Sequence, residues 1–257
     1  MISAWLGIRS AIVSVAGATF VAASAVPAGV EGAPRHARSL REAPVTRTES
    51  SSRAEVDGIA HRISVTRPRI QDDLIPYGAT RKHEMALYSR RHYGRARWRL
   101  IHPHVIVLHF TGGNSYSSAW QTFASNAPEL GELPGVCAHF IVGQKGVIHR
   151  LVPPSIRCRH TIGLNYTAIG VEMVQRSGPG SHWADQQILH RWLQIRAALR
   201  LVRWLKARYA IGMRNIIGHA MANSSPLFRD REGWRNTHTD WLWSDVVAFR
   251  HRLAGMS

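Results

Sequence analysis

The sequence predicts an α/β fold, with a central mixed β-sheet flanked by helices in a single domain over residues 79–257. Two apolar runs are typical of buried strands, at residues 105–108 and residues 168–174. Between residues 188 and 209, apolar side chains recur about every 3.6 residues, which predicts a long amphipathic helix. Because strands and helices alternate along the chain, we expect the helices to cover one sheet.

The other predicted elements continue this alternation. Pro128 follows a helical stretch and marks its end. Gly143 and Gly146 join two apolar runs, which indicates a hairpin. Ser244 is the predicted N-cap of the last helix. These further elements are helices over 79–93, 115–126 and 244–253, a hairpin over 137–152, and a short strand or strand-like turn over 215–219.

The N-terminal region differs in composition from the rest of the chain. Residues 1–25 carry one charged residue, Arg9, then an apolar run and Ala23-Ser-Ala25, which is typical of a signal-peptide cleavage site. The apolar run is shorter than the ~20 residues that span a bilayer. We therefore expect a signal peptide cleaved near Ala25 and a secreted or cell-envelope protein, with an uncleaved anchor as the alternative. Residues 26–78 are predicted to form a basic flexible arm or linker.

The chain is strongly basic, with 33 Lys+Arg against 16 Asp+Glu and a formal net charge of +17. Such a charge favours an anionic partner. For an exported protein this partner would be an acidic wall polymer or anionic lipid. The leader argues against nucleic acid, and the sequence carries no recognised nucleic-acid motif. A basic composition without any specific partner is the remaining interpretation.

The chain has two cysteines, Cys137 and Cys158. In an exported protein, an even pair so close in sequence is a candidate disulfide. Two buried free thiols are the alternative, because spacing alone does not establish a compatible geometry.

Several candidate metal ligands follow short apolar runs. With 15 histidines in the chain, any single one is weak evidence. His109 ends the first predicted strand, and His219 ends the apolar run 216–218. His238 and Asp240 stand two residues apart, so they would share a face of an extended segment. Two imidazoles and one carboxylate at strand ends would suit Zn²⁺ with a fourth position open to water.

A series of short motifs links these residues in one order. The motifs are Val105-Ile-Val-Leu-His109-Phe-Thr-Gly-Gly113, Ala138-His139-Phe-Ile-Val, Asn165-Tyr-Thr-Ala-Ile-Gly-Val-Glu172, Ile217-Gly-His219 and His238-Thr-Asp240. Together they resemble the type 2 N-acetylmuramoyl-L-alanine amidases, which are related to phage lysozyme-type amidases and animal peptidoglycan recognition proteins. The resemblance covers about residues 103–253. It implies the fold of that family and zinc-dependent hydrolysis of the amide between N-acetylmuramic acid and L-alanine in peptidoglycan.

The resemblance also implies a role for each matching residue. His109 and His219 match the family's two zinc-binding histidines, and Asp240 matches the third ligand, which is Asp or Cys in active members. Glu172 matches the acidic residue proposed as general base. His238 stands where many relatives carry a Lys thought to stabilise the oxyanion, and a histidine there can donate a hydrogen bond to the developing charge.

Three other residues are candidate substrate contacts. His160 begins His160-Thr-Ile-Gly163, which resembles a family stretch that lines the substrate cleft. His139 is the second candidate, and both histidines have an ordinary structural role as the equal alternative. Asn165 is the third, with a turn before the Glu172 strand as its alternative.

Two further functions compete with the amidase. The first is a module of the same fold that binds peptidoglycan without cutting it, although the retained Asp240 favours catalysis. The second is a zinc peptidase that acts on another amide. The expected cofactor is Zn²⁺ and the expected partner is peptidoglycan or its muropeptides, bound by a monomer.

Overall fold

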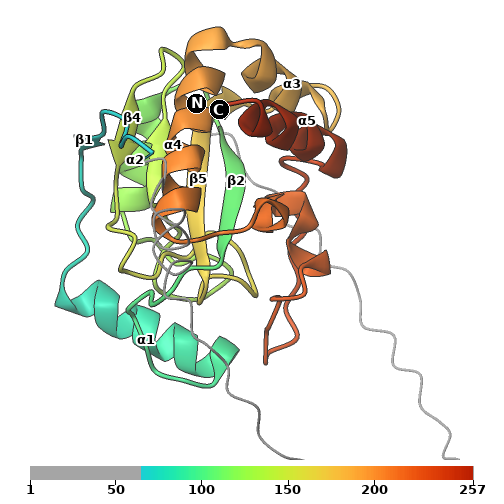
Figure 1. Ribbon diagram of the computed structural model, residues 1–257. Helices are drawn as coiled ribbons and strands as arrows, with labels where there is room; N and C mark the ends of the chain where they lie inside the picture. The colour runs from blue at the N-terminus through green and yellow to red at the C-terminus, as the bar shows by residue number, and fades with distance from the viewer. Residues whose placement is uncertain (1–64, 257) are drawn as a thin grey trace, which may run out of the picture. The chain divides into compact units, whose positions relative to one another are not determined.

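One mixed sheet organises the part of the chain that the structure describes. A computed structural model describes residues 65–256, so the predicted signal peptide and residues 26–64 of the predicted arm lie outside the described residues. Six strands form the sheet in the order β1-β4-β3-β5-β2-β6 (Figure 1). The strands are β1 Gln71–Asp72, β2 Val105–Gly112, β3 Phe140–Val142, β4 Ile148–Arg150, β5 Ala168–Arg176 and β6 Ile216–Gly218. The β3–β4 pair is antiparallel and the other pairs are parallel, which confirms the predicted mixed sheet.

Helices pack around this sheet, with α4 lying along one of its faces in Figure 1. The helices are α1 Ala79–Tyr93, α2 Tyr116–Ala124, α3 Trp183–His190, α4 Trp192–Arg208 and α5 Trp243–Ala254, with short 3₁₀ turns at Met213–Asn215 and His219–Ser224. The single helix predicted over 188–209 is divided, because Arg191 has an extended backbone between α3 and α4. The last helix begins at Trp243, one residue before the predicted cap, and Leu242 occupies its N-cap position. No helix within residues 65–256 is long and apolar enough to cross a membrane.

The sheet begins inside the predicted arm, so the prediction of a flexible segment up to residue 78 is wrong at its C-terminal end. Gln71 and Asp72 pair in parallel with β4, and the Ile75 amide donates to the Leu151 carbonyl. Ile75 is buried. A strand of two polar residues at the edge of a sheet has no hydrophobic period, which is why its sequence resembles a linker.

Burial on both faces explains the continuous apolar runs of the central strands. On one face, Ile106 and Leu108 of β2 join the core that α4 covers. On the other face, Val105 and Val107 pack with Ile217 of β6. A strand covered on both faces loses the alternation of polar and apolar residues.

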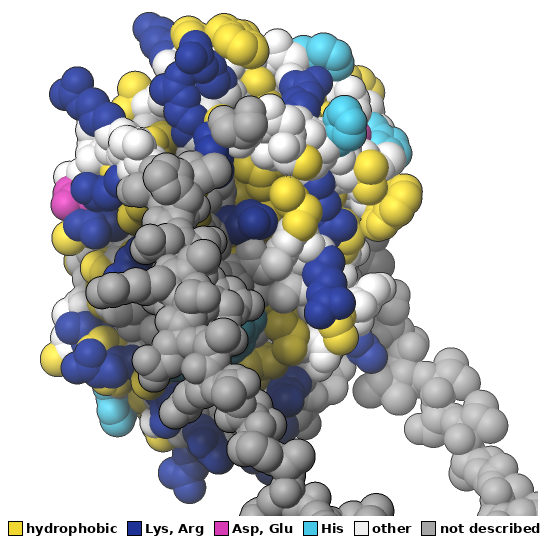
Figure 2. Space-filling view, viewed as in Figure 1, with side chains coloured by type: hydrophobic (Ala, Val, Ile, Leu, Met, Phe, Trp, Pro, Cys, Tyr) yellow, Lys and Arg dark blue, Asp and Glu magenta, His cyan; other side chains and the backbone are white. Residues whose placement is uncertain are grey.

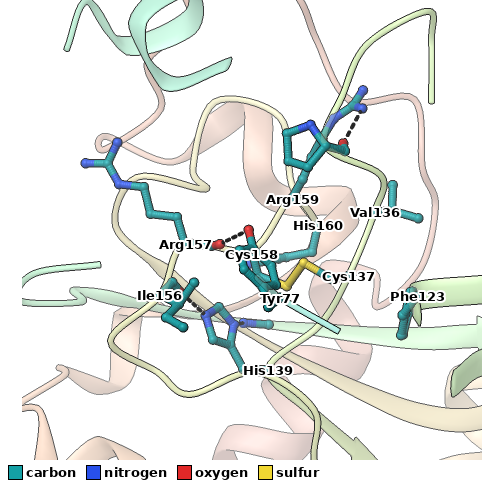
Figure 3. Close-up of a disulfide and its surroundings, with 12 residues drawn as sticks. Tyr77, Phe123, Val136, Cys137, His139, Ile156, Arg157, Cys158, Arg159 and His160 are labelled. Atoms are coloured by element: carbon teal, nitrogen blue, oxygen red, sulfur yellow. Dashed lines mark hydrogen bonds between the residues drawn. A yellow bond between two sulfur atoms is a disulfide. The ribbon is translucent and has the colours of Figure 1, made fainter. Parts of the chain in front are cut away.

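The two cysteines lie in a separate buried cluster that includes Ile141 of β3 and Val174 of β5. Cys137 and Cys158 form a disulfide with 5.5 Å between their Cα atoms, which confirms the predicted pairing (Figure 3). The bridge ties the segment before β3 to the loop that carries His160.

A close approach between β6 and the segment after Asp240 closes the C-terminal edge of the sheet. Trp241 is fully buried with φ +57°, and its indole N–H donates to the His109 carbonyl over 3.3 Å. A Cβ at Gly218 would lie 1.7 Å from the Trp241 carbonyl oxygen. Only glycine therefore fits at position 218.

We expect Gly218→Ala to lower the free energy of unfolding by about 3 kcal/mol or more, because a backbone atom fills the space that the methyl needs. Gly212→Ala is the matched control, since nothing lies within 4 Å of a Cβ there. Its stability should stay within about 0.5 kcal/mol of the parent. Urea denaturation measures both, and equal stabilities would contradict the close approach.

Candidate metal centre

His109, His219 and Asp240 meet at the C-terminal ends of β2 and β6. The two Nδ1 atoms are 3.1 Å apart. Asp240 Oδ2 lies 3.2 Å from the Nδ1 of His109, and Asp240 Oδ1 lies 3.2 Å from the Nδ1 of His219. All three side chains are buried. Four tetrahedral ligands at the usual zinc distances of about 2.0–2.1 Å stand roughly 3.3–3.4 Å from one another. The donor types and their spacing therefore fit Zn²⁺, and the predicted grouping of these three residues is confirmed.

Backbone contacts bring the three side chains together from distant parts of the sequence. His109 lies within β2, whereas His219 begins the 3₁₀ turn after β6. The Ala220 amide donates to the Asp240 carbonyl over 3.0 Å, which fixes the third residue beside that turn. The Trp241 indole, bonded to the His109 carbonyl, holds the same segment against β2.

The His219 ring is oriented by an amide behind it. Its Nε2 lies 2.9 Å from Asn236 Oδ1, which can only accept, so Nε2 carries the proton and Nδ1 presents its lone pair to the site. The Asn236 amide is fixed in turn, because its Nδ2 donates to the Ile162 carbonyl and to Asn223 Oδ1.

His109 is oriented in the same way by another histidine. His160 Nε2 faces the Ala168 carbonyl at 3.4 Å, so His160 Nδ1 is free to accept from His109 Nε2 over 3.1 Å. This leaves His109 Nδ1 unprotonated toward the site. Burial lowers the pKa of His109 to about 4, and burial followed by the His109 charge lowers the pKa of His160. Both rings are neutral near pH 7, as a metal-binding histidine and its acceptor must be.

A glycine in β5 makes room for this second histidine. A Cβ at Gly170 would lie 2.8 Å from the His160 ring. The glycine of the Ile-Gly-Val-Glu motif thus has a packing role that supports the His109 ring.

Glu172 lies beside His109 because the two residues are register partners in β5 and β2. Its carboxyl is buried, and Oε2 has no hydrogen-bond partner within the described part of the chain. Burial and then the Asp240 carboxylate raise the pKa of Glu172 well above its ordinary value. No Lys or Arg between residues 65 and 256 pairs with it, which excludes a structural salt bridge there. The carboxyl is therefore available to exchange a proton.

His238 is the exposed group beside the three buried ones. Its ring stacks on His219 with centroids 4.3 Å apart, and its side chain is 51% exposed. A substrate that reaches the site can therefore contact His238 directly.

The comparisons with known proteins agree with this arrangement. Residues 99–240 match the family described as N-acetylmuramoyl-L-alanine amidase, which is more than half of the chain. The chain belongs to this amidase family. Among curated protein sequences, none matches the chain.

Solved structures of other amidases are similar to the chain. LysC from Clostridium intestinale URNW is 18% identical, with 71% of this chain and 97% of that chain covered at a TM-score of 0.42. The endolysin of the Thermus scotoductus MAT2119 bacteriophage Ph2119 is 16% identical, covering 71% and 99% at a TM-score of 0.40. AmiD from E. coli, in complex with an anhydro-N-acetylmuramic acid peptide, is 22% identical, covering 58% of each chain at a TM-score of 0.39.

Two of the candidate substrate contacts, His139 and Asn165, have no exposed surface and take the structural role that the sequence left open as the alternative. His139 accepts from the Gly170 amide at Nδ1 and donates from Nε2 to the Ile156 carbonyl (Figure 3). Asn165 Oδ1 accepts from the backbone amides of His160 and Thr161. Both residues hold the backbone that positions His160 behind the metal centre. Sequence patterns place them near the site but do not show which side they face.

No sequence pattern indicated the roles of Asn236 and His92. His92 is buried, with Nδ1 2.8 Å from Asp230 and Nε2 2.9 Å from Glu132. These two contacts link loops that are far apart in sequence. No local motif accompanies either residue, because each acts through a partner distant along the chain.

We expect Asn236→Ala to weaken zinc binding about 10- to 100-fold, since the His219 ring loses the acceptor that fixes its proton. Competition with a chromophoric chelator measures the affinity. Parental affinity in the alanine variant would show that His219 is positioned without Asn236.

A buried carboxyl beside the third ligand predicts a pH effect on stability. Asp185 Oδ2 accepts from the Leu242 amide over 3.1 Å, and burial raises the pKa of Asp185 from 3.8 to about 7. A raised carboxyl pKa means that the folded state binds the proton more tightly, so stability is lost as pH rises through this window. In the Asp185→Asn variant, the free energy of unfolding should therefore change less with pH across this window than in the parent. Denaturation at a series of pH values, with a chelator present, measures both profiles. Identical profiles would contradict the prediction.

Proposed function

We propose that this family member is a secreted, zinc-dependent enzyme that hydrolyses the amide bond between N-acetylmuramic acid and L-alanine in peptidoglycan. The observation that carries the proposal is the buried His109–His219–Asp240 group with an unpaired Glu172 carboxyl next to it. Export rests on the predicted signal peptide.

Each residue of the candidate site has a separate role in amide hydrolysis. His109, His219 and Asp240 would hold Zn²⁺, which when bound polarises a carbonyl and lowers the pKa of water. Glu172 takes a proton from the attacking water and returns it to the departing amine. His238 donates a hydrogen bond to the oxygen on which negative charge develops. The carbon–nitrogen bond breaks, leaving a lactyl carboxylate on the sugar and a free amino group on L-alanine.

The electrostatics around Glu172 support its role as a proton carrier. A carboxyl with an ordinary pKa is a weak acid–base catalyst near neutral pH, and efficiency is greatest when the pKa lies near the working pH. Burial and the Asp240 charge shift the pKa of Glu172 in that direction.

We expect Glu172→Gln to keep its zinc and to lose activity about 10²- to 10⁴-fold, because the amide cannot carry the proton. His109→Ala should lose both zinc and activity, since it removes a ligand atom. Purified peptidoglycan is digested with and without chelator, the products are identified by mass spectrometry, and bound zinc is measured by atomic emission.

The products distinguish the competing functions. Free stem peptides that begin with L-alanine, lost with chelator and restored by zinc, support the amidase. Intact peptidoglycan that retains the protein would indicate a binding module, and cleavage within the peptide a zinc peptidase. A fully active Glu172→Gln variant would remove Glu172 as the base.

A further inference from the structure

One long stretch of the chain carries basic residues and no acidic ones. No Asp or Glu stands between Asp185 and Asp230, a stretch that includes all of α4. Within it, α4 carries Arg196, Arg200, Arg203 and Lys206 among its residues. Helix α4 therefore has an excess of positive charge that no acidic residue of the helix balances.

These cations lie on the outer side of α4. Arg196, Arg200 and Arg203 follow the spacing of residues on one helix face. The opposite side is buried in the core through residues such as Leu199 and Val202. Figure 2 shows the molecule from the side on which α4 lies, and Lys and Arg side chains far outnumber acidic ones there.

The segment before β1 adds a further cation to this surface. The Arg67 guanidinium lies 5.6 Å from the centre of the Trp204 ring on α4. We call the surface formed by Arg67, Arg196, Arg200, Arg203 and Lys206 the α4 basic face.

No cation of the α4 basic face forms a salt bridge with an acidic residue inside the described range; the Arg–carboxylate pairs there involve Arg91 and Arg150. Like charges at the i,i+4 spacing of a helix destabilise it slightly. No carboxylate offsets the repulsion between these cations, and a binding partner would explain the arrangement.

The surface fits a linear polyanion better than a bilayer. Trp192 and Leu193 at the first turn of α4 are exposed, whereas the larger apolar side chains along the rest of the helix pack in the core. The helix therefore has no continuous free apolar face to enter lipid. The Trp192 and Trp204 rings are each paired with a guanidinium, at 5.4 and 5.6 Å. The cations from Arg196 to Lys206 extend over roughly 15 Å of helix axis. Arginine binds phosphate with paired donors, and Arg outnumbers Lys on this face.

We propose that the α4 basic face binds a linear phosphodiester polymer attached to the cell wall. The choice of a wall polymer rests on the proposed function, which places the substrate in peptidoglycan. Contact along α4 would hold the enzyme on the wall while the metal centre, built from β2, β6 and the 236–241 segment, remains open to the peptide.

The test compares two triple variants of the full chain in the inactive Glu172→Gln background. One variant replaces Arg196, Arg200 and Arg203 with glutamine. The matched control removes the exposed Arg90, Arg95 and Arg97 in the same way, so the net charge changes equally. Binding to wall sacculi that carry a phosphodiester polymer is measured across salt concentrations, and again after hydrofluoric acid has removed the polymer.

We expect the α4 variant to bind the polymer-bearing sacculi at least about tenfold more weakly at physiological salt. The slope of log affinity against log salt should fall by about two, as expected for three lost phosphate contacts on a flexible strand. The control should change little, and stripped sacculi should bind parent and α4 variant alike. In the active background, the α4 variant should cleave a soluble muropeptide at the parental rate.

Other outcomes overturn the proposal. Equal losses in both triple variants would show a general charge effect. If the α4 variant still binds stripped sacculi more weakly than the parent does, the α4 basic face binds peptide carboxylates instead of the polymer. Tighter binding to anionic phospholipid vesicles or duplex DNA would assign it to a membrane or to nucleic acid. Because binding is measured without turnover, failure of the amidase assay leaves this result interpretable.

Discussion

The parallel pairing of β2 with β5 is the constraint on which the candidate site depends. It sets His109 beside Glu172, while the pairing of β2 with β6 brings His219 to the same edge. A slip of one residue would turn His109 to the opposite face of the sheet. Burial of both faces makes such a slip costly, because Ile106 and Leu108 fill one core and Val105 and Val107 another. The apolar packing of the sheet therefore determines the geometry of the polar residues at its end.

The two acidic side chains at the site have no positively charged side chain beside them in the described part of the protein. Asp240 and Glu172 are both buried, and the first raises the pKa of the second. Within residues 65–256, no Lys or Arg pairs with either carboxyl, and burial keeps the neighbouring His109 neutral. Two buried carboxylates without a cation are unfavourable unless one is protonated or a metal compensates them. A divalent ion between the histidines and Asp240 would provide that compensation, which is an electrostatic argument for a metal independent of family membership.

The sequence predicted the elements that are buried on both sides and missed those whose partners are remote. The runs of β2 and β5 are apolar throughout, so their pattern was sufficient. β1 consists of Gln71 and Asp72, and only its pairing with β4 makes it a strand. The ligands could be proposed because each follows an apolar run or shares a short motif. The contacts of His160 and Asn236 could not, because their partners depend on the folded loops. The role of His139 stayed open, because its motif does not reveal its burial.

Helix α4 connects the proposed surface to the site without belonging to it. Buried Gln194 donates from Nε2 to the carbonyls of Val142 and Val174, so the start of α4 is fixed to the ends of β3 and β5. The strand that carries Glu172 and the helix that carries the cations thus form one rigid unit. Binding through the outer side of α4 would then raise the local concentration of wall substrate without changing the metal geometry. On this argument the basic face affects capture of the insoluble wall, whereas the chemical step depends on the strand ends alone.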